Sequence, residues 1–381
     1  MRWLTCCLTV LVSSACVVPP AQVDAGADAA VETPDAMVVD AGAPDAGSDD
    51  AGDIDAGLFD AGGPADAGPD AGSVDSGASD SGAADAGLAD AGSTDAGRDA
   101  GIDAGALGPD GCLLGEDAGT FIQLRAVAAN LTTGGSQTWD PGHGLRILQG
   151  IRPDLVMIQE FNVASNTTQG TQAFVDALSA DAGFQWWRGQ GAIPNGVISR
   201  WPIIEAGDWT DPQVNNRTFA WAHVDLPGPR DLWVVSIHFL TTGSGARAAE
   251  ANALIDELAN RVPTRDFLLI GGDFNTQTRG ENCINVLEPR AETGPDMPTD
   301  QLGNDGTNAA RNRPYDRVLT SQCLIKYAVP TVAGAVTLDG GLVVDTRTHV
   351  PLTEIAPAVF GDSSANNMQH MAIVKDFLIP Q

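Results

Sequence analysis

The stretch Leu268-Leu-Ile-Gly-Gly-Asp-Phe-Asn275 decides the fold class of this chain. Its apolar residues are typical of a buried strand, and two glycines lead into a carboxylate and a carboxamide two residues apart. Because alternate residues of an extended segment point to the same side, Asp273 and Asn275 are expected to present their oxygens together. Such oxygens seat a hard divalent cation or orient a phosphate beside one. The same Asp-x-Asn pattern is common in turns. Further motifs elsewhere in the chain are therefore needed to distinguish a turn from a ligand site.

The acidity of the chain is concentrated in one segment. The 381 residues carry a formal net charge of −30, and residues 17–110 contain 21 acidic residues against one basic residue. This segment repeats Asp, Ala, Gly and Ser in a loose five-residue pattern, without the fixed apolar positions of a calcium-binding β-roll. It has too little apolar surface to offset the ordering of its backbone. We therefore predict a disordered linker at 17–118 and a folded domain at 119–381.

The N-terminus predicts export. A short basic start precedes Leu4–Val12, which is apolar but too short to cross a bilayer as a helix. The small residues before Cys16 resemble a bacterial lipoprotein signal, in which that cysteine is lipidated, although Ser13 stands where an aliphatic residue is usual. Residues 1–16 are thus predicted to be a signal peptide, with the lipid anchor as the protein's one contact with a membrane. We expect an outer-membrane or cell-surface lipoprotein, and a secreted or periplasmic protein is the alternative.

Export makes disulfide bonds possible. If the first two cysteines leave with the signal and the third is lipidated, Cys112, Cys283 and Cys323 remain. We predict a disulfide between Cys283 and Cys323, because each lies just beyond a motif expected at one edge of the site. Cys112 is then left over. No spacing in the chain is typical of metal-ligating cysteines.

From Phe121 onward the sequence predicts one α/β domain. Apolar patterns predict strands at 124–128, 155–158, 196–199, 218–225, 232–238, 267–271, 317–320 and 371–377. Amphipathic patterns predict helices around 145–151, 174–178 and 254–262. Many strands with helices placed irregularly among them indicate packed sheets covered by helices, not a simple doubly wound sheet.

Polar residues lie at or just past the ends of these apolar strands. They are Asn130, Glu160, His238, Asp273, Asn275, Asp316 and His370. Taken singly, each has an ordinary structural explanation, and either histidine could be a hydrogen-bonded core residue. Ligand sites in α/β proteins gather at the carboxyl ends of strands. So many placements of the same kind predict one shared site.

The ordered motifs of the folded part resemble those of the endonuclease/exonuclease/phosphatase superfamily. They are Asn130, Gln159-Glu160, Asn195-Gly-Val-Ile-Ser-Arg-Trp-Pro-Ile203, Ser236-Ile-His238, Gly272-Asp-Phe-Asn-Thr276, Tyr315-Asp-Arg-Val-Leu319 and His370. The resemblance runs from about Phe121 to Phe377. It implies the DNase I-like fold, a four-layer α/β sandwich of two facing mixed sheets flanked by helices. It also implies hydrolysis of phosphodiesters with Mg²⁺, or with Mn²⁺ or Ca²⁺ in its place.

The resemblance implies a role for each residue of the site. The residues implied to hold the metal are Asn130, Glu160, Asp273 and Gln369. Those implied to act in catalysis are His238, Asp273, Asn275, Asp316 and His370, with Asp316 orienting the last of them. Those implied to contact the substrate phosphate are Asn130, Asn195 and Asn275. The family usually has Asp where this chain has Gln369, so we expect weaker metal binding, or compensation by a nearby acid such as Asp362.

The charge of the folded part bears on the substrate. Residues 111–381 contain 29 acidic and 18 basic residues, with only two lysines among them, which leaves no general basic surface for a polyanion. We predict a monomeric, exported nuclease that binds its substrate without great affinity. A phospholipid, sphingomyelin or small-molecule phosphoesterase is the alternative enzyme. A catalytically impaired surface binding protein is the alternative of another class.

Overall fold

The computed structural model describes residues 108, 111–112, 119–135, 137–181 and 183–381. The predicted signal peptide, Cys16 and almost all of the predicted linker lie outside these residues. Within the described ranges, no helix is both long enough and apolar enough to cross a membrane.

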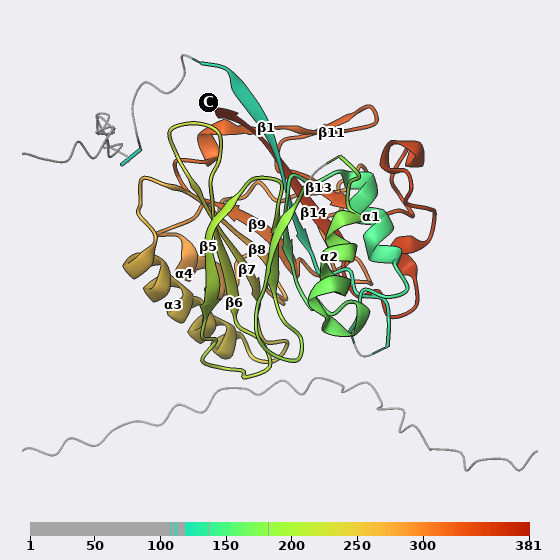
Figure 1. Cartoon of the computed structure of the whole chain (residues 1–381), viewed down its shortest axis with the longest axis horizontal. Coiled ribbons are helices and arrows are strands. Elements are labelled where there is room, and N and C mark those ends of the chain that lie inside the picture. The colour runs from blue at the N-terminus through green and yellow to red at the C-terminus, as the bar shows by residue number, and fades with distance from the viewer. Residues whose placement is uncertain (1–107, 109–110, 113–118, 136, 182) are drawn as a thin grey trace, which may run out of the picture. The chain divides into compact units, whose positions relative to one another are not determined.

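Two β-sheets form the middle of the domain (Figure 1). The seven-stranded sheet contains β1 (Phe121–Ala129), β2 (Leu155–Ile158), β3 (Gln185–Arg188), β4 (Gly196–Ser199), β10 (Ala328–Val329), β13 (Leu342–Val344) and β14 (Ala372–Pro380). The five-stranded sheet contains β5 (Ile203–Trp209), β6 (Phe219–Val224), β7 (Leu232–His238), β8 (Phe267–Asp273) and β9 (Asp316–Thr320). A separate hairpin pairs β11 (Thr331–Ala333) with β12 (Val336–Leu338).

Both sheets are mixed. In the larger sheet the strand order is β10-β14-β1-β2-β4-β3, with β13 also paired to β14, and in the smaller one it runs from β5 to β9 in chain order. The parallel pairs are β1 with β2 and β7 with β8, and the other pairs are antiparallel. The helices are α1 (His143–Ile151), α2 (Thr168–Asp176), α3 (Ser244–Arg261) and α4 (Asn282–Leu287), with short 3₁₀ turns η1 (Ala164–Asn166), η2 (Ile325–Tyr327), η3 (Leu352–Ile355) and η4 (Asp362–Ser364).

Hydrophobic residues form one layer between the sheets and one under each pair of helices. Strand residues alternate between two faces, so a strand buried on both sides contributes to two layers. In β1, Leu124 packs between the sheets and Val127 packs under α1 and α2. In β7, Val234 packs between the sheets and Val235 packs under α3 and α4. Figure 1 shows α1 and α2 on one outer side and α3 and α4 on the other, which confirms the predicted four-layer α/β sandwich.

The predicted elements agree best with the structure where strands are buried on both faces. β2, β4 and β7 have the predicted bounds, because such strands form unbroken apolar runs. The patterns do not predict β5, since Glu205 and Asp208 interrupt its apolar character, and they also miss the short helix α4. The helix predicted at 254–262 begins earlier, at Ser244, because its first turns are rich in alanine and carry no continuous apolar stripe.

The predicted Cys283–Cys323 disulfide is wrong. Cys112 pairs with Cys323 at a Cα–Cα distance of 5.4 Å, and Cys283 is a free, buried thiol in α4. The two cysteines that were expected to pair lie in different hydrophobic layers. Cys283 packs under the helices with Ile284, whereas Cys323 packs between the sheets together with Cys112. The bond therefore joins the segment before β1 to the turn after β9.

We predict that Cys112→Ser lowers the free energy of unfolding by several kcal/mol under oxidising conditions. The bond joins residues 211 positions apart, and the chain-entropy model gives about 5 kcal/mol as an upper value for so large a loop. Denaturant unfolding of the oxidised wild type and the variant measures the difference. Cys283→Ala is the control that removes a thiol but keeps the bond, and peptide mapping that finds Cys283 cross-linked in the wild type contradicts this assignment.

Candidate active site

The predicted site residues gather at one edge of the sandwich. Five of them end a strand or follow it closely: Asn130, Glu160, His238, Asp273 and Asn275. Asp316 and His370 instead lie at the amino ends of β9 and β14, so the rule of carboxyl ends does not describe them. These two strands run antiparallel to β8 and β1, which brings their amino ends to the same edge. In the register of β8 and β9, Asp316 is the direct partner of Asp273.

The two glycines of β8 let the sheets approach each other at this edge. A Cβ on Gly271 would lie 2.5 Å from the sulfur of Met157, which belongs to the opposite sheet. Gly272 has a φ of 141°, and a Cβ there would lie 2.1 Å from the carbonyl oxygen of Ile237 and 2.7 Å from Nε2 of Gln159. The positive φ and the backbone contact therefore require glycine at position 272, whereas a side chain at position 271 would first have to displace the end of Met157. The close approach places Asp273 next to residues that follow strands of the other sheet.

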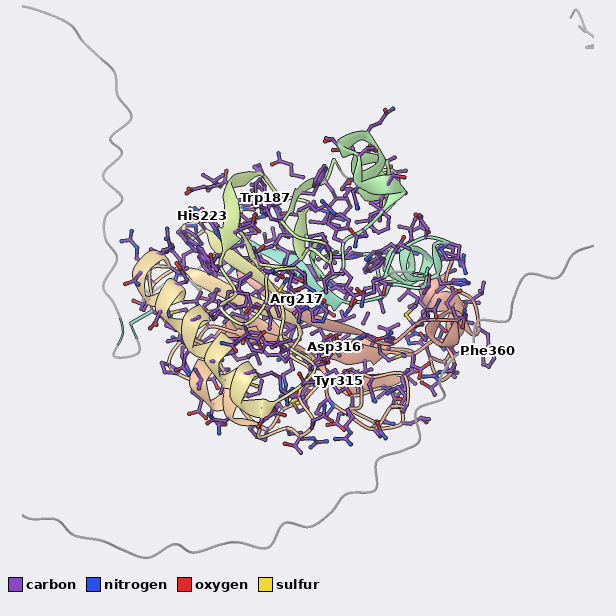
Figure 2. The ribbon with its side chains drawn as sticks, turned by 90° about the horizontal axis from the view of Figure 1, so that it is seen from below. Trp187, Arg217, His223, Tyr315, Asp316 and Phe360 are labelled. Atoms are coloured by element: carbon purple, nitrogen blue, oxygen red, sulfur yellow. A yellow bond between two sulfur atoms is a disulfide. The ribbon has the colours of Figure 1, made fainter. Side chains whose placement is uncertain are left out.

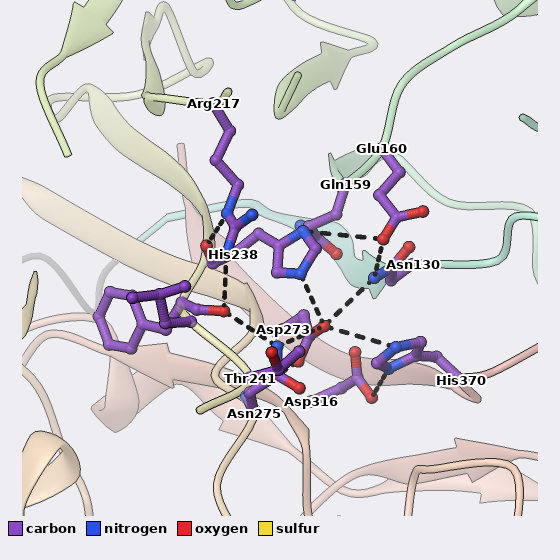
Figure 3. A network of polar contacts seen from close by, with 12 residues as sticks. Asn130, Gln159, Glu160, Arg217, His238, Thr241, Asp273, Asn275, Asp316 and His370 are labelled. Carbon is purple, nitrogen blue, oxygen red and sulfur yellow. Dashed lines mark hydrogen bonds and ion pairs between the residues drawn. The ribbon is translucent and has the colours of Figure 1, made fainter. Parts of the chain in front are cut away.

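Asp273 is the centre of the polar network (Figure 3). Its Oδ2 lies 3.2 Å from Nε2 of His238 and 3.4 Å from Nε2 of His370. The same oxygen accepts hydrogen bonds from the carboxamides of Asn130, at 3.2 Å, and Asn275, at 3.1 Å. Its Oδ1 accepts from the backbone amide of Asn275 at 2.9 Å. A single buried carboxylate thus joins groups from both sheets.

Glu160 faces Asp273 from the other sheet. Its Oε1 accepts a long hydrogen bond of 3.4 Å from Asn130 and lies 3.9 Å from Nδ1 of His238, and its Oε2 accepts from Thr132 at 3.2 Å. Glu160 and Asn275 both have a φ of 50°. This left-handed backbone is unfavourable for a glutamate and persists where the surroundings fix it, which is common at functional sites.

His370 is held by Asp316 and, through the backbone, by Thr307. Nδ1 of His370 lies 2.9 Å from Oδ2 of Asp316, as predicted for this pair. The hydroxyl of Thr307 accepts from the amide of Asp316 at 2.8 Å, and its carbonyl accepts from the amide of Met371 at 2.7 Å. Thr307 therefore fixes both strands that carry the pair, a role that its place in a loop does not signal in the sequence.

Arg217 supports His238 from behind. Its guanidinium donates to the carbonyl oxygens of His238 and Phe239. The second of these carbonyls also accepts from the carboxamide of Asn275 at 2.9 Å. Figure 2 shows Arg217 and Asp316 toward the middle of the face seen from below, with Phe360 at its periphery. The arginine lies two residues before β6, at the amino end of a strand like Asp316 of β9, so a search of both ends of each strand could have found it.

Burial and nearby charges shift the pKa values of the two histidines in opposite directions. Burial lowers the pKa of His370, but the charges of Asp316 and Asp273 outweigh it and raise that pKa to about 10. Burial, with the nearby charges of Arg217 and His370, lowers the pKa of His238 well below its usual value. Burial raises the pKa of Asp273 to about 7. A site with one charged and one neutral imidazole has both a proton donor and a proton acceptor.

The donor set fits a hard divalent cation. Ligand atoms of Asp273, Asp316 and His370 all lie within 4.8 Å of one another. Two buried oxygens at the site, Oδ1 of Asn130 and Oδ1 of Asp316, have no hydrogen-bond partner among the described residues. Glu160 makes only long contacts through Oε1. Carboxylate and carboxamide oxygens that lack partners are what Mg²⁺, Mn²⁺ or Ca²⁺ would satisfy.

Three residues considered in the sequence are not joined to this network by any contact that the structure shows. The carboxamide of Asn195 is buried and donates to the carbonyl oxygen of Thr218 at 2.7 Å, so its predicted contact with phosphate gains no support. Gln369 is exposed although its neighbour His370 is buried. Asp362 forms ion pairs with His143 and Arg146, so the expectation that it compensates for Gln369 gains no support.

Comparison with known proteins identifies the kind of domain. The model of the endonuclease/exonuclease/phosphatase family matches residues 118–334, which is more than half of the chain. The match includes every predicted site residue up to Asp316 and ends before Gln369 and His370. No curated protein matches the sequence.

Several solved structures are similar in fold. An endonuclease/exonuclease/phosphatase from Beutenbergia cavernae has 18% identity and a TM-score of 0.45 over 68% of this chain and 72% of its own. One from Bacteroides vulgatus has 15% identity and a TM-score of 0.46 over 68% and 100%. The beta toxin of Staphylococcus aureus has 13% identity and a TM-score of 0.41 over 66% and 99%.

We predict that Glu250 makes the protein less stable as the pH rises. This buried residue of α3 accepts from the amide of Leu240, at 3.0 Å to each oxygen, and lies next to Asp211. Burial and the charge of Asp211 raise the pKa of Glu250 from 4.5 to about 8. A raised folded-state pKa gives a contribution that is complete below the unfolded value and is lost as the pH rises to the folded one.

Glu250→Gln, which stays uncharged, should therefore flatten the fall in unfolding free energy between about pH 4.5 and pH 8. Urea unfolding at several pH values measures this slope for the wild type and the variant. Asp256→Asn removes an exposed carboxylate from the same helix and should leave the slope as it is. Equal slopes for the wild type and Glu250→Gln would show that the buried carboxyl does not titrate in this range.

Proposed function

The chain belongs to the endonuclease/exonuclease/phosphatase family, and on that premise we propose that it is an exported, metal-dependent phosphodiesterase that acts on nucleic acid. Members of this family are generally hydrolases of phosphodiester bonds. The observation that carries the proposal is the position of one carboxylate, Asp273, within 3.4 Å of the Nε2 atoms of two histidines. Hydrolysis of a phosphodiester requires a proton to be taken from water and another to be given to the leaving oxygen, and two imidazoles supply both functions.

The metal would be held by oxygens from both sheets. Glu160 and Asn130 approach from the larger sheet and Asp273 from the smaller one, with Asp316 close enough to contribute. When bound, the ion would act as a Lewis acid toward the phosphate oxygens. Gln369 adds no charge to this set, so the ion would depend on the three buried carboxyl groups.

The remaining side chains would orient the substrate and move protons. Asp316 fixes Nδ1 of His370 and leaves its Nε2 to face the reacting group. The carboxamides of Asn130 and Asn275 are the neutral donors nearest to this point. Donors fixed in advance stabilise charge that develops on phosphate oxygens, because they need no reorganisation during the reaction.

An uncharged surface depression, lined by the segment that leads into Arg217, favours recognition through hydrogen bonds. Residues 212–216, directly before Arg217, line an open cavity of about 480 Å³ and include Gln213, Asn215 and Asn216. Amide groups accept and donate hydrogen bonds to bases and phosphates but attract no polyanion over long distances. This agrees with the small number of basic residues and favours a nuclease that releases its substrate after each cut.

The disulfide supports the proposed export. Bonds such as Cys112–Cys323 form and persist in oxidising compartments and are rare in the cytosol. We propose that residues 1–16 direct export, with Cys16 as the lipidated residue, and that residues 17–118 tether the catalytic domain to the membrane. Cleavage without lipidation would give a secreted or periplasmic enzyme instead.

We predict that the purified chain nicks plasmid DNA in the presence of Mg²⁺, Mn²⁺ or Ca²⁺ and stops when the metal is chelated. His370→Ala should lower the rate at least about 100-fold, the usual loss when a general acid or base is removed. Glu160→Ala should also lower the rate, because it removes a carboxylate that would hold the metal. The assay compares plasmid DNA, RNA, sphingomyelin vesicles and bis-p-nitrophenyl phosphate as substrates.

His223→Ala and Glu205→Gln are the matched controls, because both residues lie outside the site, on β6 and β5. Their rates should equal that of the wild type. Turnover of sphingomyelin vesicles alone would replace the nuclease by a phospholipid enzyme. No turnover of any substrate with any metal would leave a surface binding protein.

We predict that Gln369→Asp tightens metal binding about tenfold. The substitution adds a negative charge next in sequence to His370, which belongs to the cluster of Asp273, Asp316 and His370 that could hold a cation. The metal concentration at half-maximal activity, or calorimetry where activity is absent, measures the change. An unchanged metal dependence would show that position 369 does not contribute to the site.

A further inference from the structure

A cavity with two unpaired cationic side chains lies away from the active site. It has a volume of about 150 Å³ and lies between β9 of the smaller sheet and β14 of the larger one, under the segment 292–298. Arg317 and Lys375 line it, together with Met297, Val318, further residues of these three segments and Ile325 of η2. None of the residues assigned to catalysis or to the metal lines it.

Arg317 is almost fully buried without a carboxylate partner. Only 2% of its surface is exposed, and its Nε has no hydrogen-bond partner among the described residues. Its Nη1 contacts the sulfur of Met297 at 3.1 Å, which is a weak acceptor, and only Nη2 reaches oxygens, the nearest being the carbonyl of Arg279 at 3.0 Å. Two of the three guanidinium nitrogens therefore lack an oxygen acceptor, which is costly for a buried charge.

Lys375 is the second cation and is also unpaired. It lies on the face of β14 that packs between the sheets, like Ile373 and Phe377 two positions away on either side. It makes no hydrogen bond or ion pair with any residue that the structure describes. Burial lowers the pKa of Lys375 to about 8, and only the more distant charges of Asp296 and Glu292 oppose this.

The acidic residues of the cavity stand at its opening. Asp296 is exposed and Glu292 is partly exposed, and both belong to the segment that covers the cavity. Neither forms an ion pair with Lys375 or Arg317, so both cations stay available. The acidic opening disfavours long polyanions, whereas a compact anion can pass and contact both cations. A volume of 150 Å³ is enough for an ion of five heavy atoms, since a cavity of this size holds benzene.

We propose that this cavity binds a small oxyanion of the phosphate type between Lys375 and Arg317. The anion would accept hydrogen bonds from the ammonium group and from the unsatisfied nitrogens of the guanidinium. Such charge-assisted bonds are stronger than those between neutral groups and would offset the burial of Arg317 and the partial burial of Lys375. The proposal does not depend on the catalytic activity, because the cavity and the active site share no residue.

The test uses the fact that the chain contains only two lysines. In the full chain labelled with ¹³C-lysine, NMR resolves one set of side-chain signals for Lys375 and one for Lys326, and Lys375→Met assigns them. Inorganic phosphate is added at constant ionic strength, with chloride as the reference anion and without divalent metal. We expect the Lys375 signals to move with saturation and those of Lys326 to stay in place.

Calorimetry with phosphate then compares variants. Lys375→Met should weaken binding at least tenfold, whereas Lys375→Arg, which keeps a cation, and the control Lys326→Met should remain within a few-fold of the wild type. In His370→Ala the Lys375 signals should still move, which separates this cavity from the active site. Signals that do not move, that move equally with chloride, or that stop moving in His370→Ala would each overturn the proposal.

Discussion

The site depends on the absence of two side chains, at Gly271 and Gly272. Without a Cβ at these positions, Met157 and Gln159 of the larger sheet pack directly against β8 of the smaller sheet. A Cβ at position 272 would lie 2.1 Å from the carbonyl oxygen of Ile237 in the neighbouring strand β7 and 2.7 Å from Nε2 of Gln159, and a Cβ at position 271 would displace the end of the Met157 side chain. The hydrogen bond of 3.2 Å between Asn130 and Asp273 links the two sheets beside these contacts. The site is thus built on close packing around β8 as well as on its polar groups.

Bringing the sheets together also concentrates charge in a buried space. Asp273, Asp316 and Glu160 are buried carboxyl groups, and His370 is the one nearby side chain whose charge attracts all three of them strongly. Repulsion among carboxylates and loss of hydration raise the cost of this arrangement. Unpartnered oxygens and left-handed backbone at Glu160 fit the same view, since functional sites often carry unfavourable local features that the surrounding packing supports. A bound cation would relieve both the repulsion and the missing contacts.

The sequence predicts this site well because its chemistry is tied to strand ends. Buried strands form apolar runs that are easy to recognise, so the polar residue next to each run stands out, as His238 does after β7. Residues that act through a loop have no such signal. Thr307 holds Asp316 and the start of β14, but its spacing from either is arbitrary in the sequence. Disulfide pairing is equally hidden, because it depends on which hydrophobic layer receives Cys283, and α4 turns that residue into the core under the helices.

Gln369 is exposed, whereas the residues of the site are buried. This difference in exposure argues for a site that is altered at position 369 but otherwise complete. An aspartate at 369 would be a fourth acid close to Asp273, Asp316 and Glu160, and its exposure would keep most of its charge in water. The absence of an aspartate at position 369 therefore weakens the long-range attraction for a cation more than it removes a fixed contact. The buried groups keep their mutual geometry, as the 2.9 Å contact between His370 and Asp316 shows. Under the proposed function, chemistry that depends on these fixed groups would be retained, and Gln369 would affect how tightly, not where, a metal is held.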